Sequence, residues 1–129
     1  MKPKLSSIEG RDFGQYWLLV DTFYHNKFYS KEYTEHLGHF LKKLSARKVL
    51  DAACGIGFPI IELAEKGFEL TCSDGNDSML EVFWQRATEK GLAFPIIQAR
   101  WSELPTKMTG TFDTVLCLDS SITYVDSWA

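Results

Sequence analysis

Apolar residues along the chain fall into strand-like runs and stretches of helix-like spacing. Runs that are continuously apolar, or that alternate apolar with polar residues, predict four β-strands at about 48–52, 68–73, 94–99 and 112–118. Elsewhere apolar residues recur every three or four positions, which is typical of amphipathic helices. These stretches predict helices at 15–25, from Ser30 to about Leu44, at 59–66 and at 78–90. Strands that alternate with helices predict an α/β fold with parallel strands and right-handed crossovers.

Two of the predicted helices have a clear apolar face and a recognisable cap. Ser30 is the expected N-cap of one, and its inner face is Tyr33, Leu37, Phe40, Leu41 and Leu44. Asn76 or Asp77 caps the other, Gly91 ends it, and its inner face is Met79, Leu80, Phe83 and Ala87. Core packing is also the preferred interpretation of Phe28. The strand at 112–118 is apolar enough to be buried on both faces.

Composition narrows the class of protein. A chain of 129 residues, 45% apolar and 24% charged, fits one small globular domain. We expect an irregular, flexible arm over 1–14 and the domain over 15–129. A net charge of −3 argues against a dedicated nucleic-acid binder. The early apolar runs are too short for a signal or membrane span, and three cysteines in apolar settings suggest reduced thiols, so we expect a cytoplasmic protein. The cysteines and histidines lack the spacing of a metal site.

The segment KVLDAACGIGF, residues 48–58, predicts a strand, a glycine turn and then a helix. Gly55 and Gly57 permit positive φ angles, and a ligand can lie against backbone that has no side chain. A pyrophosphate-binding turn would have a third glycine where Ile60 stands, and Pro59 removes one N–H from the start of the helix. The turn therefore suits a nucleoside ligand without phosphates.

This segment resembles motif I of the class I S-adenosylmethionine-dependent methyltransferases. Asp51 matches the acidic residue of the motif, and Gly55 and Gly57 match its glycines. Ala53 stands where the first glycine is commonest, a variant similar to the glycine (sarcosine) N-methyltransferase branch. The resemblance implies a Rossmann-like sheet with helices on both faces, of which about four strands, the N-terminal half, are present. It also implies S-adenosylmethionine as the cofactor.

A second acid, Asp74, follows the second predicted strand. At that position a carboxylate can accept hydrogen bonds from both ribose hydroxyls of a nucleoside, or can simply form a turn. The segment from Asp74 to Leu80 is similar to the methyltransferase pattern, which favours the ribose role. Arg100 departs from the acid or amide of the family, and we expect it to stack on the adenine or to face solvent. The expected cofactor-binding residues are Tyr33, Asp51, Ala53, Cys54, Gly55, Gly57, Asp74, Gly75, Met79, Arg100, Trp101 and Leu118.

The loop after Leu118 is the expected acceptor side of the site. It lacks the Asn-Pro-Pro-Tyr type motif of methyltransferases that act on base amines, which disfavours that substrate class. The resemblance to the glycine N-methyltransferase branch around Ala53-Cys54, at Trp101 and in this loop implies a small amine such as glycine or sarcosine. Asp119 and Tyr124 are the candidate catalytic residues, with Asp119 orienting the amine or merely capping the loop. Two alternatives remain open: a cofactor-binding module without turnover, and a nicotinamide-dependent oxidoreductase fragment.

The sheet edge is the last sequence feature with a functional consequence. The resemblance places the fourth strand beside the first, and nothing else in the sequence is expected to cover its other edge. Val115, Leu116 and Leu118 are apolar, and the strand has no lysine, proline or bulge to protect it. We therefore expect a homo-oligomer formed through this edge, unless the chain is part of a longer protein.

Overall fold

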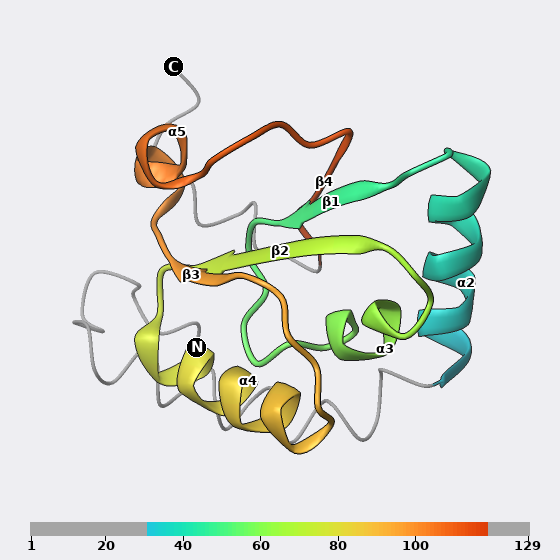
Figure 1. The fold of residues 1–129 in the computed structure, drawn as a ribbon, viewed down its shortest axis with the longest axis horizontal. Helices are drawn as coiled ribbons and strands as arrows, with labels where there is room; N and C mark the ends of the chain where they lie inside the picture. Colours follow the sequence, from blue (N-terminus) through green and yellow to red (C-terminus); the bar gives the residue numbers. More distant parts are fainter. Residues whose placement is uncertain (1–30, 119–129) are drawn as a thin grey trace, which may run out of the picture.

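The computed structural model describes residues 31–118, which form an α/β fold around one parallel sheet (Figure 1). The sheet has the strand order β3-β2-β1-β4. Its strands are β1 (Lys48–Asp51), β2 (Glu69–Asp74), β3 (Ile96–Gln98) and β4 (Thr114–Leu116). The helices are α2 (Lys31–Lys43), α3 (Ile60–Ala64), α4 (Asp77–Glu89), the 3-10 turn η2 (Trp101–Glu103) and α5 (Leu104–Lys107). The predicted fold class and the place of β4 beside β1 are confirmed, whereas the helix expected at 15–25 and the Ser30 cap lie outside the described residues.

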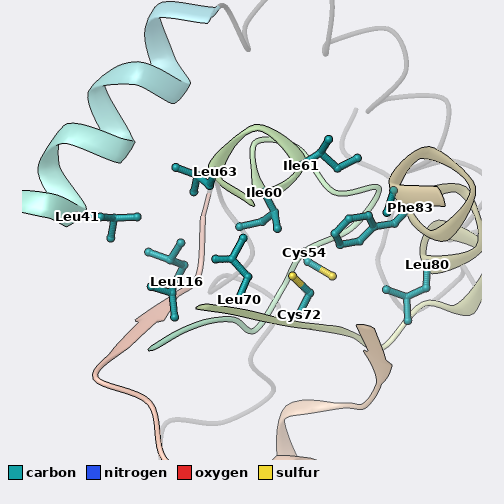
Figure 2. Packing of buried hydrophobic residues seen from close by; sticks show 12 residues of the cluster. Leu41, Cys54, Ile60, Ile61, Leu63, Leu70, Cys72, Leu80, Phe83 and Leu116 are labelled. Atoms are coloured by element: carbon teal, nitrogen blue, oxygen red, sulfur yellow. The ribbon is translucent and has the colours of Figure 1, made fainter. Parts of the chain in front are cut away.

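The core lies on one face of this sheet. Val49 is in register with Leu70 on β2 and with Thr114 on β4, so these side chains share a face. Leu41 of α2, Leu63 of α3 and residues of α4 pack on that face, as Figure 2 shows. The cluster is Leu41, Val49, Cys54, Ile60, Ile61, Leu63, Leu70, Cys72, Leu80, Phe83, Ala87 and Leu116. No helix among the described residues is long and apolar enough to cross a membrane.

Helix α2 buries only part of the predicted stripe: Leu41 is buried and Leu37 packs against the core, as expected. Thr34, Gly38 and Leu41 are its buried residues, while Phe40 and Leu44 are each 57% exposed. The expected core packing of Phe40 is therefore wrong. The physical reason is that the buried stripe is centred near Thr34, and residue 40 lies about 120° around the helix from residue 34, so Phe40 points away from that stripe. The small residues Thr34 and Gly38 let the helix approach closely, and the sequence pattern gave no weight to them.

Helix α4 follows the prediction closely. The Asn76 side chain accepts a hydrogen bond from the Met79 N–H (3.1 Å), so Asn76 and not Asp77 is the N-cap. All four predicted inner residues are buried: Met79, Leu80, Phe83 and Ala87. In α3, by contrast, Pro59 is the N-cap and the helix begins at Ile60, one residue later than expected.

The C-terminal elements are shorter than predicted. β3 covers three residues instead of 94–99, and α5 lies in a segment for which no helix was predicted. β4 also covers three residues, and Val115 at its centre is 60% exposed. Burial of this strand on both faces is therefore wrong for the described residues. Val115 lies on the face opposite the core, where its register partner Leu50 on the interior strand β1 is buried, whereas Val115 on the end strand of the described sheet is exposed.

Candidate functional site

The glycine loop, residues 52–58, connects β1 to α3 at the carboxyl end of the sheet. Gly55 (φ +52°) and Gly57 (φ +91°) adopt the left-handed conformation that was predicted for them. The Cys54 N–H donates to the Ser73 carbonyl oxygen (3.0 Å), and the Gly55 N–H donates to Asp74 Oδ2 (2.9 Å). These two bonds fasten the glycine loop to the end of β2, so the predicted acid and the predicted turn belong to one site.

Gly57 has a structural role that the sequence did not reveal. A Cβ atom built on Gly57 would lie 2.3 Å from a ring atom of Phe83 on α4. The missing side chain therefore makes room for Phe83 of the core, and not for a ligand as the sequence suggested. Gly75, the other glycine of the predicted site, has ordinary space around it, with the nearest atom on Arg100 at 3.6 Å.

Asp74 holds the backbone on both sides of the site. Besides accepting from Gly55, it accepts a hydrogen bond from the Asn76 N–H on Oδ1 (2.9 Å). Burial raises the pKa of Asp74, and the backbone N–H groups of Asn76, Gly55 and Gly75 oppose that shift. A carboxylate offers about four acceptor positions, so these bonds leave capacity for ribose hydroxyls.

Asp51 is a second carboxyl group at the same end of the sheet, and its side chain is almost fully buried. It accepts a hydrogen bond from the Ala53 N–H on Oδ1 (3.1 Å). Burial raises its pKa to about 7, the Ala53 N–H opposes this, and the charge of Asp74 adds to it. Burial and the charge of Asp51 also raise the pKa of Tyr33, the predicted tyrosine of α2.

Trp101 joins the segment after β3 to the glycine loop. Its indole N–H donates to the Ala52 carbonyl oxygen at 2.7 Å. Arg100 is exposed, and its backbone N–H donates to Glu103 Oε2 (2.7 Å), which begins η2. Trp101 therefore contacts the glycine loop, while a role of Trp101 or Arg100 in cofactor binding stays a prediction.

The remaining predicted residues differ in their placement. The side chains of Cys54 and Met79 are buried, 4% and 7% exposed, and Cys54 belongs to the core cluster. Leu118 is half-buried and packs against the same cluster. Asp119 and Tyr124 lie outside the described residues. Cys54 and Cys72 are free and buried, as expected, while Cys117 is only half-buried.

Sequence reasoning missed Arg86 of α4. One of its guanidinium nitrogens, Nη1, donates to the Ile56 carbonyl oxygen of the glycine loop (3.3 Å), and the group lies over the ring of Phe58. The sequence contains one indication of this role: Arg86 follows Phe83 by three residues, and residues with that spacing are neighbours on the surface of a helix.

The two features described so far, a parallel sheet and a glycine loop bonded to an acid after β2, define a Rossmann-like nucleoside-binding domain. Residues 49–129 match the family described as "Methyltransferase domain". The chain belongs to this family, and the resemblance to class I S-adenosylmethionine-dependent methyltransferases is confirmed.

Individual relatives agree with this assignment. The chain is 39% identical over 85 residues to a glycine/sarcosine N-methyltransferase of Parasynechococcus marenigrum, covering 66% of this chain and 30% of that protein. It is 34% identical over 105 residues to the glycine N-methyltransferase of Oryctolagus cuniculus, covering 74% and 36%. The structure of magnesium protoporphyrin IX methyltransferase from Synechocystis PCC 6803 with bound S-adenosylmethionine matches with a TM-score of 0.59 and 25% identity, covering 88% and 52%. The chain spans about a third of the length of the first curated relatives.

Proposed function

We propose that this chain binds S-adenosylmethionine and transfers its methyl group to the nitrogen of a small amine such as glycine or sarcosine. The observation that carries the proposal is the hydrogen bond between the Gly55 N–H and Asp74 (2.9 Å), because it joins the family's glycine turn and second acid into one site. The choice of a small amine as methyl acceptor is supported by the names of the relatives, which are glycine or glycine/sarcosine N-methyltransferases. A cytoplasmic location fits the free, buried thiols of Cys54 and Cys72.

The charges of the site fit this cofactor. The carboxyl group of Asp51 is buried and that of Asp74 is half-buried, and neither forms an ion pair with any lysine or arginine within residues 31–118. S-adenosylmethionine carries a sulfonium and an ammonium group, so it would bring positive charge to a place where negative charge is uncompensated. In the proposed arrangement Asp74 holds the ribose, and Asp51 with the aromatic face of Tyr33 attracts the cationic end.

When bound, S-adenosylmethionine supplies a methyl group on a good leaving group. The protein therefore has to hold the amine lone pair in line with the methyl carbon and to keep that amine neutral. We assign the orienting role to Asp119 and Tyr124, which follow β4 in the sequence. A strong covalent nucleophile is not needed for this reaction.

The experiment that tests the function has two steps. The purified chain is titrated by calorimetry with S-adenosylmethionine, S-adenosylhomocysteine and NAD, and methyl transfer to glycine and sarcosine is then followed with a labelled methyl group. We expect the two sulfur ligands to bind, NAD not to bind, and the label to appear in the amine. Binding without transfer would favour a cofactor-binding module, and binding of NAD alone would contradict the proposal.

Asp74→Ala is expected to weaken S-adenosylhomocysteine binding by about 1.5–3 kcal/mol, the range for hydrogen bonds to a charged group. The change removes the proposed ribose acceptor and the bonds to Gly55 and Asn76. Calorimetric titration measures the loss. Asp77→Ala is the matched control, because Asp77 is exposed and its carboxylate accepts only from the Ser78 N–H among the described bonds. Equal affinities in the two folded variants would remove Asp74 from the site.

We also propose self-association through β4. Within the described residues β4 pairs only with β1, and Val115 is exposed at its centre. An open edge with apolar side chains is a template for pairing with another strand. Sedimentation at micromolar concentration is expected to show a dimer or larger species that Val115→Lys reduces to monomer. A monomeric wild-type chain would contradict this proposal without affecting the proposed activity.

A further inference from the structure

Helix α4 contacts three consecutive residues of the glycine loop. Arg86 Nη1 donates to the carbonyl oxygen of Ile56 at 3.3 Å, and its guanidinium carbon lies 3.3 Å from the centroid of the Phe58 ring. Between them, Gly57 packs directly on Phe83, one turn earlier on the same helix. Two side chains of α4, Phe83 and Arg86, therefore contact residues 56–58 of the loop. The preceding residue, Gly55, bonds to Asp74.

Arginine is well suited to these two contacts at once. Its guanidinium group is planar, so it can stack on an aromatic ring and still direct an N–H in its own plane toward a carbonyl oxygen. Burial lowers the pKa of Arg86, and the charges of Glu62 and Glu89 oppose that change. The group remains a cation, because an arginine pKa starts far above the physiological range. A lysine would provide the charge without the planar stacking surface.

We propose that Arg86 is a positioning residue for the cofactor site: it fixes the backbone of residues 56–58 so that the glycine loop is already in its binding conformation before the ligand arrives. This inference rests on the proposed function, since it concerns binding of S-adenosylmethionine. A loop that is ordered in advance loses less conformational freedom on binding, and the affinity is higher for that reason. Arg86 itself does not need to touch the ligand.

The test compares Arg86→Met with Gln85→Met on the same helix. Gln85 is exposed and its side-chain amide donates to Glu89 (3.2 Å), so that variant also loses one side-chain hydrogen bond but none to the loop. Affinity for S-adenosylhomocysteine is measured by calorimetry. We expect Arg86→Met to weaken binding about tenfold, the size expected for one hydrogen bond to a charged group, and Gln85→Met to change it less than about twofold.

Hydrogen exchange separates positioning from general destabilisation. In the unliganded Arg86→Met variant the amides of residues 54–58 are expected to exchange faster, while those of β1 and β2 keep their protection. With saturating ligand the loop amides of variant and wild type should become equally protected. Unchanged loop exchange, or an equal loss of protection across the whole sheet, would overturn the inference.

Phe58→Leu provides an independent route to the same answer. It removes the ring under Arg86 and leaves the Ile56 carbonyl, so we expect the double variant to lose less affinity than the sum of the two single losses. Strict additivity would overturn the inference.

If Arg86→Met fails to fold, Arg86→Lys replaces it in the same measurements. We expect an intermediate affinity from Arg86→Lys, and wild-type affinity would overturn the inference. Wild-type protein that binds no S-adenosylhomocysteine contradicts the proposed function itself, whereas normal binding by the Arg86 variants contradicts only the positioning role.

Discussion

Gly57→Ala is expected to lower the free energy of unfolding by about 2–5 kcal/mol, the sum of an overpacked core and a left-handed backbone conformation that alanine disfavours. The new methyl group would stand 2.3 Å from a Phe83 ring atom, at a residue with φ +91°. Phe83 is fully buried, so the ring has little room to move away. Urea denaturation followed by circular dichroism measures the change.

Two other glycines serve as matched controls for this prediction. Gly67 (φ +87°) and Gly91 (φ +66°) have the same kind of backbone conformation, but a Cβ atom on either would have nothing within 4 Å. Alanine at these positions is expected to cost only about 1–2 kcal/mol, the backbone strain alone. Phe83→Leu added to Gly57→Ala should restore part of the lost stability. Equal losses at the three glycines would show that contact with Phe83 is not what requires glycine at position 57.

The second large effect concerns pH and Asp51. The ordinary pKa of this carboxyl is 3.8, and burial raises it to about 7 in the folded protein. Between these values the folded state holds a proton that the unfolded state has released, so a rise in pH favours unfolding. The stabilising contribution is fully present below pH 4 and is lost as the pH rises to about 7. The total change corresponds to about 4 kcal/mol.

Asp51→Asn removes this titration while preserving the shape of the side chain. As the pH rises from 4.5 to 7.5, we expect the variant to gain stability relative to the wild type by most of the roughly 4 kcal/mol given above. Above pH 8 the difference in free energy of unfolding between the two proteins should be constant. Denaturation curves of the two proteins at matched pH values provide the measurement. Asp74 has a raised pKa as well and remains in both proteins, so its contribution largely cancels. A stability difference that does not depend on pH would mean that Asp51 is ionised throughout.

The sequence allowed prediction of the features that depend on local chemistry. The positive φ angles of Gly55 and Gly57 follow from a strand–turn–helix segment in which only glycine fits. The buried face of α4 follows from helical spacing, and the Asn76 cap from side-chain chemistry. The contact between the glycine loop and Asp74 could be predicted too, because neighbouring parallel strands bring their carboxyl ends together.

Features that depend on distant packing could not be predicted in the same way. The large apolar residues of α2 predicted a buried stripe that includes Phe40, whereas the buried side of the helix also carries the small residues Thr34 and Gly38, which apolar spacing does not mark. The reason for glycine at position 57 lies in Phe83, a residue on another element. The sequence analysis gave Arg86 no role, and only its three-dimensional position over Phe58 indicates one in the site.

The pairing of β4 with β1 has a consequence for the order in which the protein folds during synthesis. The carboxylate of Asp113 accepts hydrogen bonds from the backbone N–H groups of Arg47 and Lys48, the first of them 66 positions earlier in the chain. The Ala52 N–H, where the glycine loop begins, donates to the carbonyl oxygen of Leu116. Contacts of such sequence separation form late, because a long loop must close before they stabilise anything. On the ribosome β1, β2 and α4 are able to assemble early, but the amide that anchors the start of the glycine loop acquires its partner only after Leu116 has emerged from the exit tunnel.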